Sequence, residues 1–158
     1  MSSVLAIDPG VSYYAWAYGE LGHIKQCGYV EGLDVKALPC AARLIVELPQ
    51  VYNHGPVRTS DIRDLTLAAG QLIAGYSALR PGVATWTPQP SEWKGSVPKD
   101  IHQERIWSKM TDDERWVMCQ LGDPKSVRSG KRAGHLAFTG RLGHAMDAGG
   151  MVLRFWRR

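Results

Sequence analysis

The sequence predicts one α/β domain over residues 1–158, built on a mixed β-sheet with helices on both faces. The apolar run 4–7 ends in Asp8 and a Pro-Gly turn, which is typical of a strand buried in the middle of a sheet. A second apolar run, 43–46, ends in Glu47 and is also followed by a proline. Helical patterns separate the later strands, and this order favours a layered α/β fold.

The first half of the chain predicts a three-stranded antiparallel meander. Residues 13–19 alternate large and small side chains, and residues 23–31 follow a Gly-containing turn, so both segments are expected to be strands. Asp34 could cap a short helix over residues 34–42, although Pro39 is unfavourable inside it. The strand that begins at residue 43 is expected to run parallel to the first one.

The second half is expected to be mostly helical. Ser60 or Asp61 can cap a helix over residues 60–79, and a short strand follows at 83–87. Pro98 suits the start of a helix at 99–110, and residues 111–114 have the pattern of a capped helix start. Residues 123–135 are expected to be a basic, mobile loop. The last helix is expected to begin at Phe138 or Thr139.

Charge is distributed unevenly along the chain, whose formal net charge is +4. Residues 1–79 carry 5 Lys/Arg and 7 Asp/Glu, whereas residues 80–158 carry 14 and 8. This asymmetry suits a polyanionic partner held beside a carboxylate site. Three widely spaced cysteines indicate reduced thiols, and no apolar run is long enough to span a bilayer. A cytoplasmic protein without membrane contact is therefore expected.

Acidic side chains and one histidine are the candidate site. Asp8 and Glu47 should lie side by side if their strands are parallel neighbours, because the carboxyl ends of such strands meet at one edge. His144 and Asp147 are three residues apart and share a helix face, and the small residues Ala148 to Gly150 allow that helix to pack closely on the sheet. Alternatively, Asp8 serves only in a turn, and His144 and Asp147 are an exposed pair.

Crowded carboxylates repel one another and favour hard divalent cations such as Mg²⁺ or Mn²⁺. Two such ions, about 3.5–4 Å apart, activate a water and stabilise the leaving oxygen in phosphodiester hydrolysis. The residue types therefore predict a two-metal nuclease.

Several motifs carry a resemblance to a known family, and they span nearly the whole chain. They are Ile7-Asp8-Pro9-Gly10, Val46-Glu47, Gln50-Val51-Tyr52, Gly70-Gln71 and His144-Ala145-Met146-Asp147-Ala148. Their order resembles that of the RuvC-type Holliday junction resolvases. The resemblance implies a ribonuclease H-like fold, with a mixed five-stranded sheet whose first three strands are antiparallel. It also implies a homodimer that cuts four-way DNA junctions by paired symmetric nicks, leaving a 5′-phosphate and a 3′-hydroxyl.

By the same resemblance, each active site uses two Mg²⁺ or Mn²⁺ ions and no small-molecule cofactor, in the cytoplasm of a bacterium or a phage-infected cell. Asp8 resembles the central metal-bridging carboxylate and Glu47 the second ligand. Asp147 and His144 resemble the helix-borne pair, in which His144 is a ligand or a proton donor. Tyr52 resembles the aromatic residue that inserts at the crossover, and a plain core or loop tyrosine is the alternative.

Basic residues are the candidate DNA contacts. The segment 93–99 resembles the family's basic segment, whose lysines contact the phosphodiester near the scissile bond. A lysine there can neutralise charge on the phosphoryl oxygens in the transition state. Lys94 is the stronger candidate, whereas Lys99 taken alone is more simply an exposed surface charge. The expected phosphate contacts further along the chain are Arg128, Lys131, Arg132 and Arg141, while Arg154 could serve only to solubilise the terminus.

An apolar stripe on the helix at 60–79 is the candidate dimer surface, because a twofold dimer places two identical sites on a twofold junction. The stripe comprises Leu65, Ala69, Leu72, Ile73 and Tyr76, and packing on the chain's own sheet is the competing explanation. Two other functions stay open. One is a different ribonuclease H-like nuclease that acts on branched DNA or RNA–DNA hybrids, and the other is a catalytically silent junction-binding module.

Overall fold

A five-stranded mixed sheet is the centre of the computed structural model, which describes residues 3–50 and 59–156. Its strands are β1 (Ser3–Pro9), β2 (Tyr13–Glu20), β3 (His23–Glu31), β4 (Arg43–Val46) and β5 (Ala84–Trp86), in the order β3-β2-β1-β4-β5. The pairs β1–β2 and β2–β3 are antiparallel, whereas β1–β4 and β4–β5 are parallel. The predicted mixed sheet, with its antiparallel meander and its central first strand, is confirmed.

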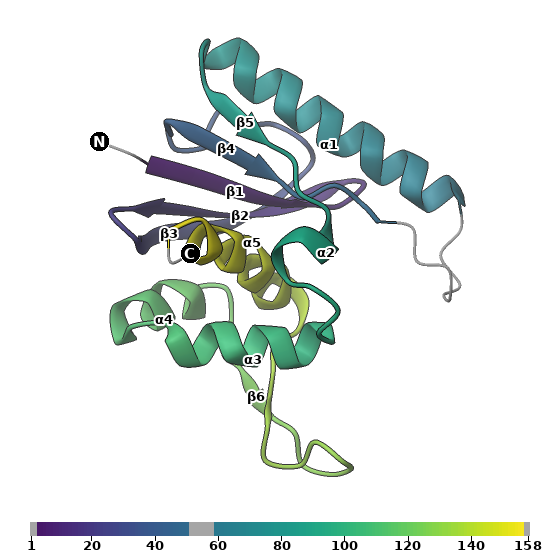
Figure 1. Cartoon of the computed structure of the whole chain (residues 1–158), viewed down its shortest axis with the longest axis vertical. Coiled ribbons are helices and arrows are strands. Elements are labelled where there is room, and N and C mark those ends of the chain that lie inside the picture. Colours follow the sequence, from purple (N-terminus) through teal and green to yellow (C-terminus); the bar gives the residue numbers. More distant parts are fainter. Residues whose placement is uncertain (1–2, 51–58, 157–158) are drawn as a thin grey trace.

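Helices cover both faces of this sheet. Figure 1 shows α1 (Thr59–Leu79) across one face and α5 (Gly140–Trp156) across the other, with α3 (Lys99–Lys109) and α4 (Asp112–Cys119) outside α5. The short helix α2 (Pro90–Trp93) lies between β5 and α3 in the chain. Among the described helices, none has the length and apolarity that a membrane span needs.

The alternation of side chains along the strands divides the core into two parts and determines the face of the sheet on which Asp8 and Glu47 lie. Successive strand side chains point to opposite faces, so Leu5 and Ile7 pack in the core under α1, while Val4 and Ala6 pack in the core under α5. Asp8 continues the second series and therefore faces α5. Glu47 follows Ile45, which belongs to the α5 core, so it faces the same helix.

The predicted helix over residues 34–42 is wrong, because this segment forms turns. The backbone N–H of Lys36 donates to Asp34 Oδ1 over 3.0 Å, and the N–H of Leu38 donates to the carbonyl of Val35 over 3.2 Å. Asp34 thus stabilises a local turn rather than a helix start. Pro39 has no N–H to continue a helix.

The basic stretch 123–135 is only partly the loop that the sequence predicts. Its start contains β6 (Lys125–Ser126), which pairs antiparallel with β7 (Leu136–Ala137). The connection between them extends beyond α3, away from the sheet (Figure 1). Arg132, within this connection, forms ion pairs with Asp100 and Glu104 of α3. The segment is therefore anchored to α3.

The paired glycines of α5 are explained mainly by neighbouring helices rather than by the sheet. A Cβ on Gly149 would lie 2.5 Å from Met118 Cε and 3.1 Å from Ile24 Cδ1 of β3. A Cβ on Gly150 would lie 2.4 Å from Ile106 Cδ1 and 2.9 Å from the ring of Trp93. Close packing of α2, α3 and α4 against α5 therefore offsets the low helix propensity of glycine, which costs roughly 1 kcal/mol per residue.

Candidate functional site

Asp8 and Glu47 end two neighbouring parallel strands. Ile7 pairs with Val46 in the register of β1 and β4, and the N–H of Glu47 donates to the carbonyl of Ile7 over 3.1 Å. The next residues, Asp8 and Glu47, are therefore adjacent, and both line a cavity of about 140 Å³. The two strand-end acids do share one crevice.

Helix α5 brings the other two candidate residues to these acids. His144 Nδ1 lies 2.8 Å from Asp8 Oδ2, and its Nε2 lies 3.3 Å from the hydroxyl of Tyr13. Asp147 is one helical turn further on and is 2% exposed. Neither residue belongs to a solvent-exposed pair, so that alternative is wrong.

Burial and mutual repulsion dominate the electrostatics of the site. Burial first, and then the negative charge of Asp8, raises the pKa of Glu47 to about 7. Burial also raises the pKa of Asp8; the hydrogen bond to His144 opposes this shift and the charge of Asp147 adds to it. Carboxyl groups that hold protons this strongly are destabilised as anions and gain from a nearby cation.

Two lysines lie at the same cluster. Lys99 Nζ is 2.5 Å from Asp147 Oδ2, and Lys94 Nζ is 4.0 Å from Glu47 Oε1. Burial alone would lower the pKa of Lys99, but the ion pair with Asp147 and the charges of Asp8 and Glu47 together outweigh it and the pKa is raised. Lys99 is at the surface, as expected, with a side chain that is 51% exposed, but its ammonium group is paired with a buried carboxylate of the cluster.

Sequence reasoning missed two residues that position the acids. Gln103 is 2% exposed, and its Nε2 donates to Asp147 Oδ1 over 2.9 Å and to the carbonyl of Gly143 over 2.8 Å. Trp93 Nε1 donates to Glu47 Oε2 over 2.7 Å. The signal for Gln103 is its spacing, because it lies four residues after Lys99 and three before Ile106, on the face of α3 that turns towards α5.

Replacing Gln103 by Leu is expected to weaken both the stability of the folded chain and the affinity of the acid cluster for a divalent cation. The variant leaves a buried carboxylate oxygen and a buried carbonyl without their donor, which costs about 2–3 kcal/mol of unfolding free energy. Loss of a group that orients a metal ligand typically costs about 10–100-fold in metal affinity or activity. Thermal unfolding and a calorimetric titration with Mg²⁺ measure the two effects. Gln120→Leu, at an exposed position at the end of α4, is the control and should change neither by more than a small fraction.

The other basic candidates lie apart from the acid cluster or are already paired. Arg128 and Lys131 are exposed in the β6–β7 connection, and Arg132 is held by two carboxylates of α3. Arg141 lies near the start of α5. Its Nη2 is 3.3 Å from Glu31 Oε1, and its guanidinium group lies over the ring of Tyr29. Tyr52 is outside the described residues, so its expected place at the crossover stays a prediction.

The apolar stripe on α1 packs mainly within its own chain. Ala69, Leu72 and Tyr76 are buried in the core between α1 and the sheet, and Ile73 packs against that core. The competing explanation is therefore the correct one for most of the stripe. Leu67, which is 59% exposed, is the large apolar side chain that α1 leaves open near its middle.

The donor set fits a hard divalent cation, although the side chains are not gathered around one point. Within residues 3–50 and 59–156, no three His, Cys, Asp or Glu side chains form a ready-made metal cluster. Asp8 turns to His144, Glu47 to Trp93, and Asp147 to Lys99 and Gln103. The buried carboxylates of Asp8 and Asp147 and the partly buried one of Glu47 lie at one end of the sheet, and carboxylate oxygens are the ligands that Mg²⁺ and Mn²⁺ prefer.

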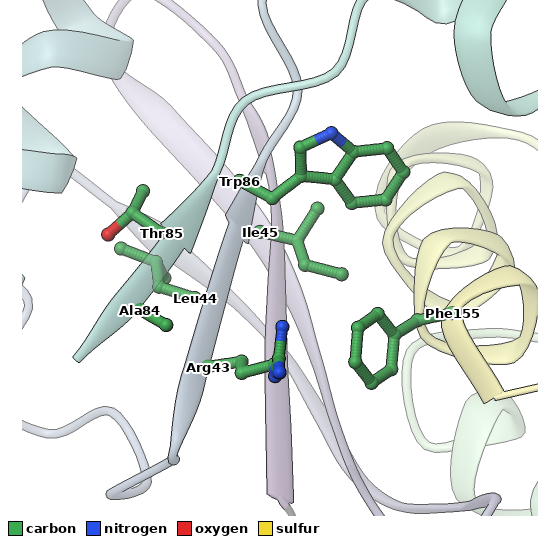
Figure 2. Close-up of a pocket in the computed structure, with 7 residues that line it drawn as sticks. All are labelled: Arg43, Leu44, Ile45, Ala84, Thr85, Trp86 and Phe155. Atoms are coloured by element: carbon green, nitrogen blue, oxygen red, sulfur yellow. The ribbon is translucent and has the colours of Figure 1, made fainter.

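A larger apolar pocket lies elsewhere, at the starting end of β4. Figure 2 shows Arg43, Ile45 and Trp86 on the side of the sheet that faces Phe155 of α5. The guanidinium of Arg43 lies 5.2 Å from the centre of the Phe155 ring. None of the candidate site residues lines this pocket, and Arg43 is at the opposite end of β4 from Glu47.

The backbone fold is similar to that of a solved protein structure. A structure of Thermus thermophilus RuvC in complex with a Holliday junction substrate matches over 98% of this chain and 92% of that chain, with a TM-score of 0.50 and 14% identity. The chain has a RuvC-like fold. A second structure of Thermus thermophilus RuvC covers 96% of this chain and 92% of that chain, with a TM-score of 0.48 and 13% identity. No protein-family model and no curated protein matches the sequence.

The RuvC-like fold agrees with the expected ribonuclease H-like architecture over the described residues. The agreement concerns the backbone, because an identity of 14% leaves few side chains in common. The roles of the individual residues are therefore argued from their own geometry.

Proposed function

We propose that this chain is a metal-dependent endonuclease that resolves four-way DNA junctions by paired symmetric nicks. One observation carries the proposal: three acids from distant parts of the chain, Asp8, Glu47 and Asp147, lie within electrostatic reach of one another at the carboxyl end of the central strands of a RuvC-like fold. Open α/β sheets bind their ligands at this edge. The junction is the substrate in the Thermus thermophilus structure of similar fold, and the basic second half of the chain suits such a polyanion.

Asp8, Glu47 and Asp147 would hold two Mg²⁺ or Mn²⁺ ions, with His144 as a further ligand or as a proton donor. Bound there, the ions would supply an activated water and charge stabilisation for the leaving oxygen. His144 is in contact with both Asp8 and Tyr13, so its imidazole orientation is set from both sides. Trp93 keeps Glu47 turned towards α2, and Gln103 keeps Asp147 turned towards α3.

Lys94 and Lys99 would change partner during catalysis. In the described structure both ammonium groups face carboxylates of the site. When these carboxylates bind cations, the ammonium groups become available to the DNA phosphate that enters the site. There they would neutralise charge that develops on the phosphoryl oxygens.

A homodimer is part of the proposal, because two symmetric cuts need two sites related by a twofold axis. Most of the α1 stripe is used within the chain, so the symmetry of the substrate, rather than that stripe, supports the dimer. A monomeric mass by light scattering at micromolar concentration, with junction cutting intact, would count against it.

The proposal predicts junction-selective cleavage that requires a divalent metal. Purified protein should cut a mobile four-way junction with Mg²⁺ or Mn²⁺ and leave it intact with EDTA. Linear duplex and RNA–DNA hybrid of the same sequence should be cut at least about 10-fold more slowly, since their geometry offers no crossover. Equal cutting of all substrates would instead favour a general ribonuclease H-like nuclease, and tight binding without cutting would favour a silent junction-binding module.

A further inference from the structure

A basic pocket lies on the far side of Trp93 from the acid site. It has a volume of about 370 Å³ and is formed by α2, α3, the segment between them and the C-terminal part of α5. Its polar lining consists of Ser91, Glu92, Lys94, His102, Arg105, Lys109 and Arg154. We call it the α2–α3–α5 pocket.

Four cationic side chains meet there, against one carboxylate. Lys94 is half-buried, whereas Arg105, Lys109 and Arg154 are exposed. The carboxylate of Glu92 accepts a hydrogen bond from the backbone N–H of Gln89 over 2.6 Å. Within the part of the chain that the structure describes, Arg105 and Arg154 have no carboxylate partner. Their guanidinium groups are therefore available to an anion from solution.

His102 reports the same positive environment. It packs edge-on against Trp93, and its Nε2 is buried without a hydrogen-bond partner among the described residues. Burial first, and then the charge of Lys94, lowers the pKa of His102 to about 4, with smaller contributions from Arg105 and Lys109. The imidazole of His102 is thus neutral at pH 7 and lies among the cationic side chains that line the pocket.

Two residues connect this pocket to the acid site. Trp93 donates its indole N–H to Glu47 while the rest of its ring lines the pocket. Lys94 Nζ is 4.0 Å from Glu47 Oε1 and 5.1 Å from the centre of the Trp93 ring. An anion in the pocket would therefore be a close neighbour of one bound at the acids.

We propose that the α2–α3–α5 pocket binds a backbone phosphate of the DNA strand that crosses the acid site, through Arg105 and Arg154. The inference rests on the proposed function, because it takes the nuclease substrate as the source of the phosphate. Guanidinium groups suit phosphate oxygens, which they can bind through two parallel hydrogen bonds. Contacts of this kind hold the strand in register without reading its sequence. Arg154 thus acquires a role beyond solubilising the terminus.

The test is the salt dependence of junction binding, measured in EDTA so that no DNA is cut. The double variant Arg105→Gln/Arg154→Gln should reduce the slope of log K against log salt by about 0.9, because the two arginines neutralise one phosphate and each neutralised phosphate contributes about 0.9. The matched control, Lys25→Gln/Lys36→Gln, removes the same charge at exposed positions outside the pocket and should shift the slope by less than about half a unit. Thermal unfolding verifies that both proteins are folded.

A junction series with one neutral methylphosphonate linkage per molecule locates the phosphate. When the methylphosphonate replaces one particular linkage near the cut, the affinity of the wild-type protein should fall by about 5-fold or more. The same replacement should not lower the affinity of the double variant any further, because the arginines that contact this phosphate are already absent. The single-turnover cleavage rate at saturating DNA should stay within about 3-fold of wild type, because neither arginine touches the acids.

The two ideas can fail separately. The pocket inference fails while the nuclease function stands if the wild-type protein cuts junctions, the double variant keeps the wild-type salt slope, and every methylphosphonate linkage affects both proteins equally. If the coupled linkage is found but no substrate is cut with Mg²⁺ or Mn²⁺, the pocket stands as a DNA site and the proposed nuclease function fails.

Discussion

Replacing Asp8 by Asn is expected to lower the rate of junction cleavage by on the order of 10³-fold or more while junction binding survives. Asp8 ends the central strand and lies against His144, 8% exposed. The amide keeps the size and the acceptor oxygen of the carboxylate, so the fold and the contact with His144 should persist. What is lost is the negative charge that attracts a divalent cation.

Binding should be equal or slightly tighter in this variant, because one charge that repels the DNA phosphates has been removed. Single-turnover cleavage with Mg²⁺ and fluorescence anisotropy with a labelled junction in EDTA measure the two properties. Asp113→Asn, at an exposed carboxylate of α4, is the matched control and should cut like the wild type. Cleavage by Asp8→Asn at the normal rate would show that the site is misassigned, and loss of binding together with a lowered Tm would make Asp8 structural.

Divalent cations are expected to stabilise the protein strongly at pH 8 and weakly at pH 5. The ordinary pKa of the Glu47 carboxyl is 4.5, and burial with the charge of Asp8 raises it to about 7 in the folded chain. Between these values the folded chain holds a proton that the unfolded chain has released. The stability of the metal-free protein therefore falls as the pH rises through this window, by on the order of 2–3 kcal/mol in total.

Cation binding replaces the proton and offsets this loss, so it is favoured at high pH. In scanning calorimetry, 10 mM Mg²⁺ should raise the Tm at pH 8 by about 4–8 °C, and at pH 5 by only a small part of that. Glu47→Gln should be more stable than wild type at pH 8 in EDTA and should gain little from Mg²⁺. Asp113→Asn should behave as wild type. A Mg²⁺ effect of the same size at both pH values would contradict the assignment of the buried acids as its cause.

Much of the fold could be predicted from local patterns. The strands β1 to β4 each have a regular alternation or an apolar run bounded by turn residues, and Thr111 with Glu114 forms the capping box that the sequence indicates at the start of α4. The segment 34–42 was mispredicted because Asp34 can stabilise a turn as well as cap a helix. The helix α2 could not be predicted because four residues are too few for a periodic signal. The capping box that Gln89 and Glu92 form at its start begins with glutamine, which is not among the usual N-cap residues.

The candidate site could be predicted only in its outline. Asp8 and Glu47 each follow an apolar strand, so parallel pairing alone brings them together, and the spacing of His144 and Asp147 puts them on one helix face. The ion pair of Lys99 could not be predicted, because a lysine at the start of a polar helix carries no local sign that it will meet a buried carboxylate from another helix. The spacing of Gln103 places it on one face of α3 with Lys99 and Ile106, but which helix packs against that face is not contained in any local pattern.

The amino-acid order by itself thus determined which segments extend, which coil and where acids end the buried strands, because these depend on side-chain periodicity and turn chemistry within a few residues. Only the tertiary structure decided that α3 delivers Lys99 and Gln103 to Asp147, that Trp93 holds Glu47, and that Arg105 and Arg154 share a pocket beside them. Such meetings depend on how α2, α3 and α5 pack, and close packing is a property of the assembled chain.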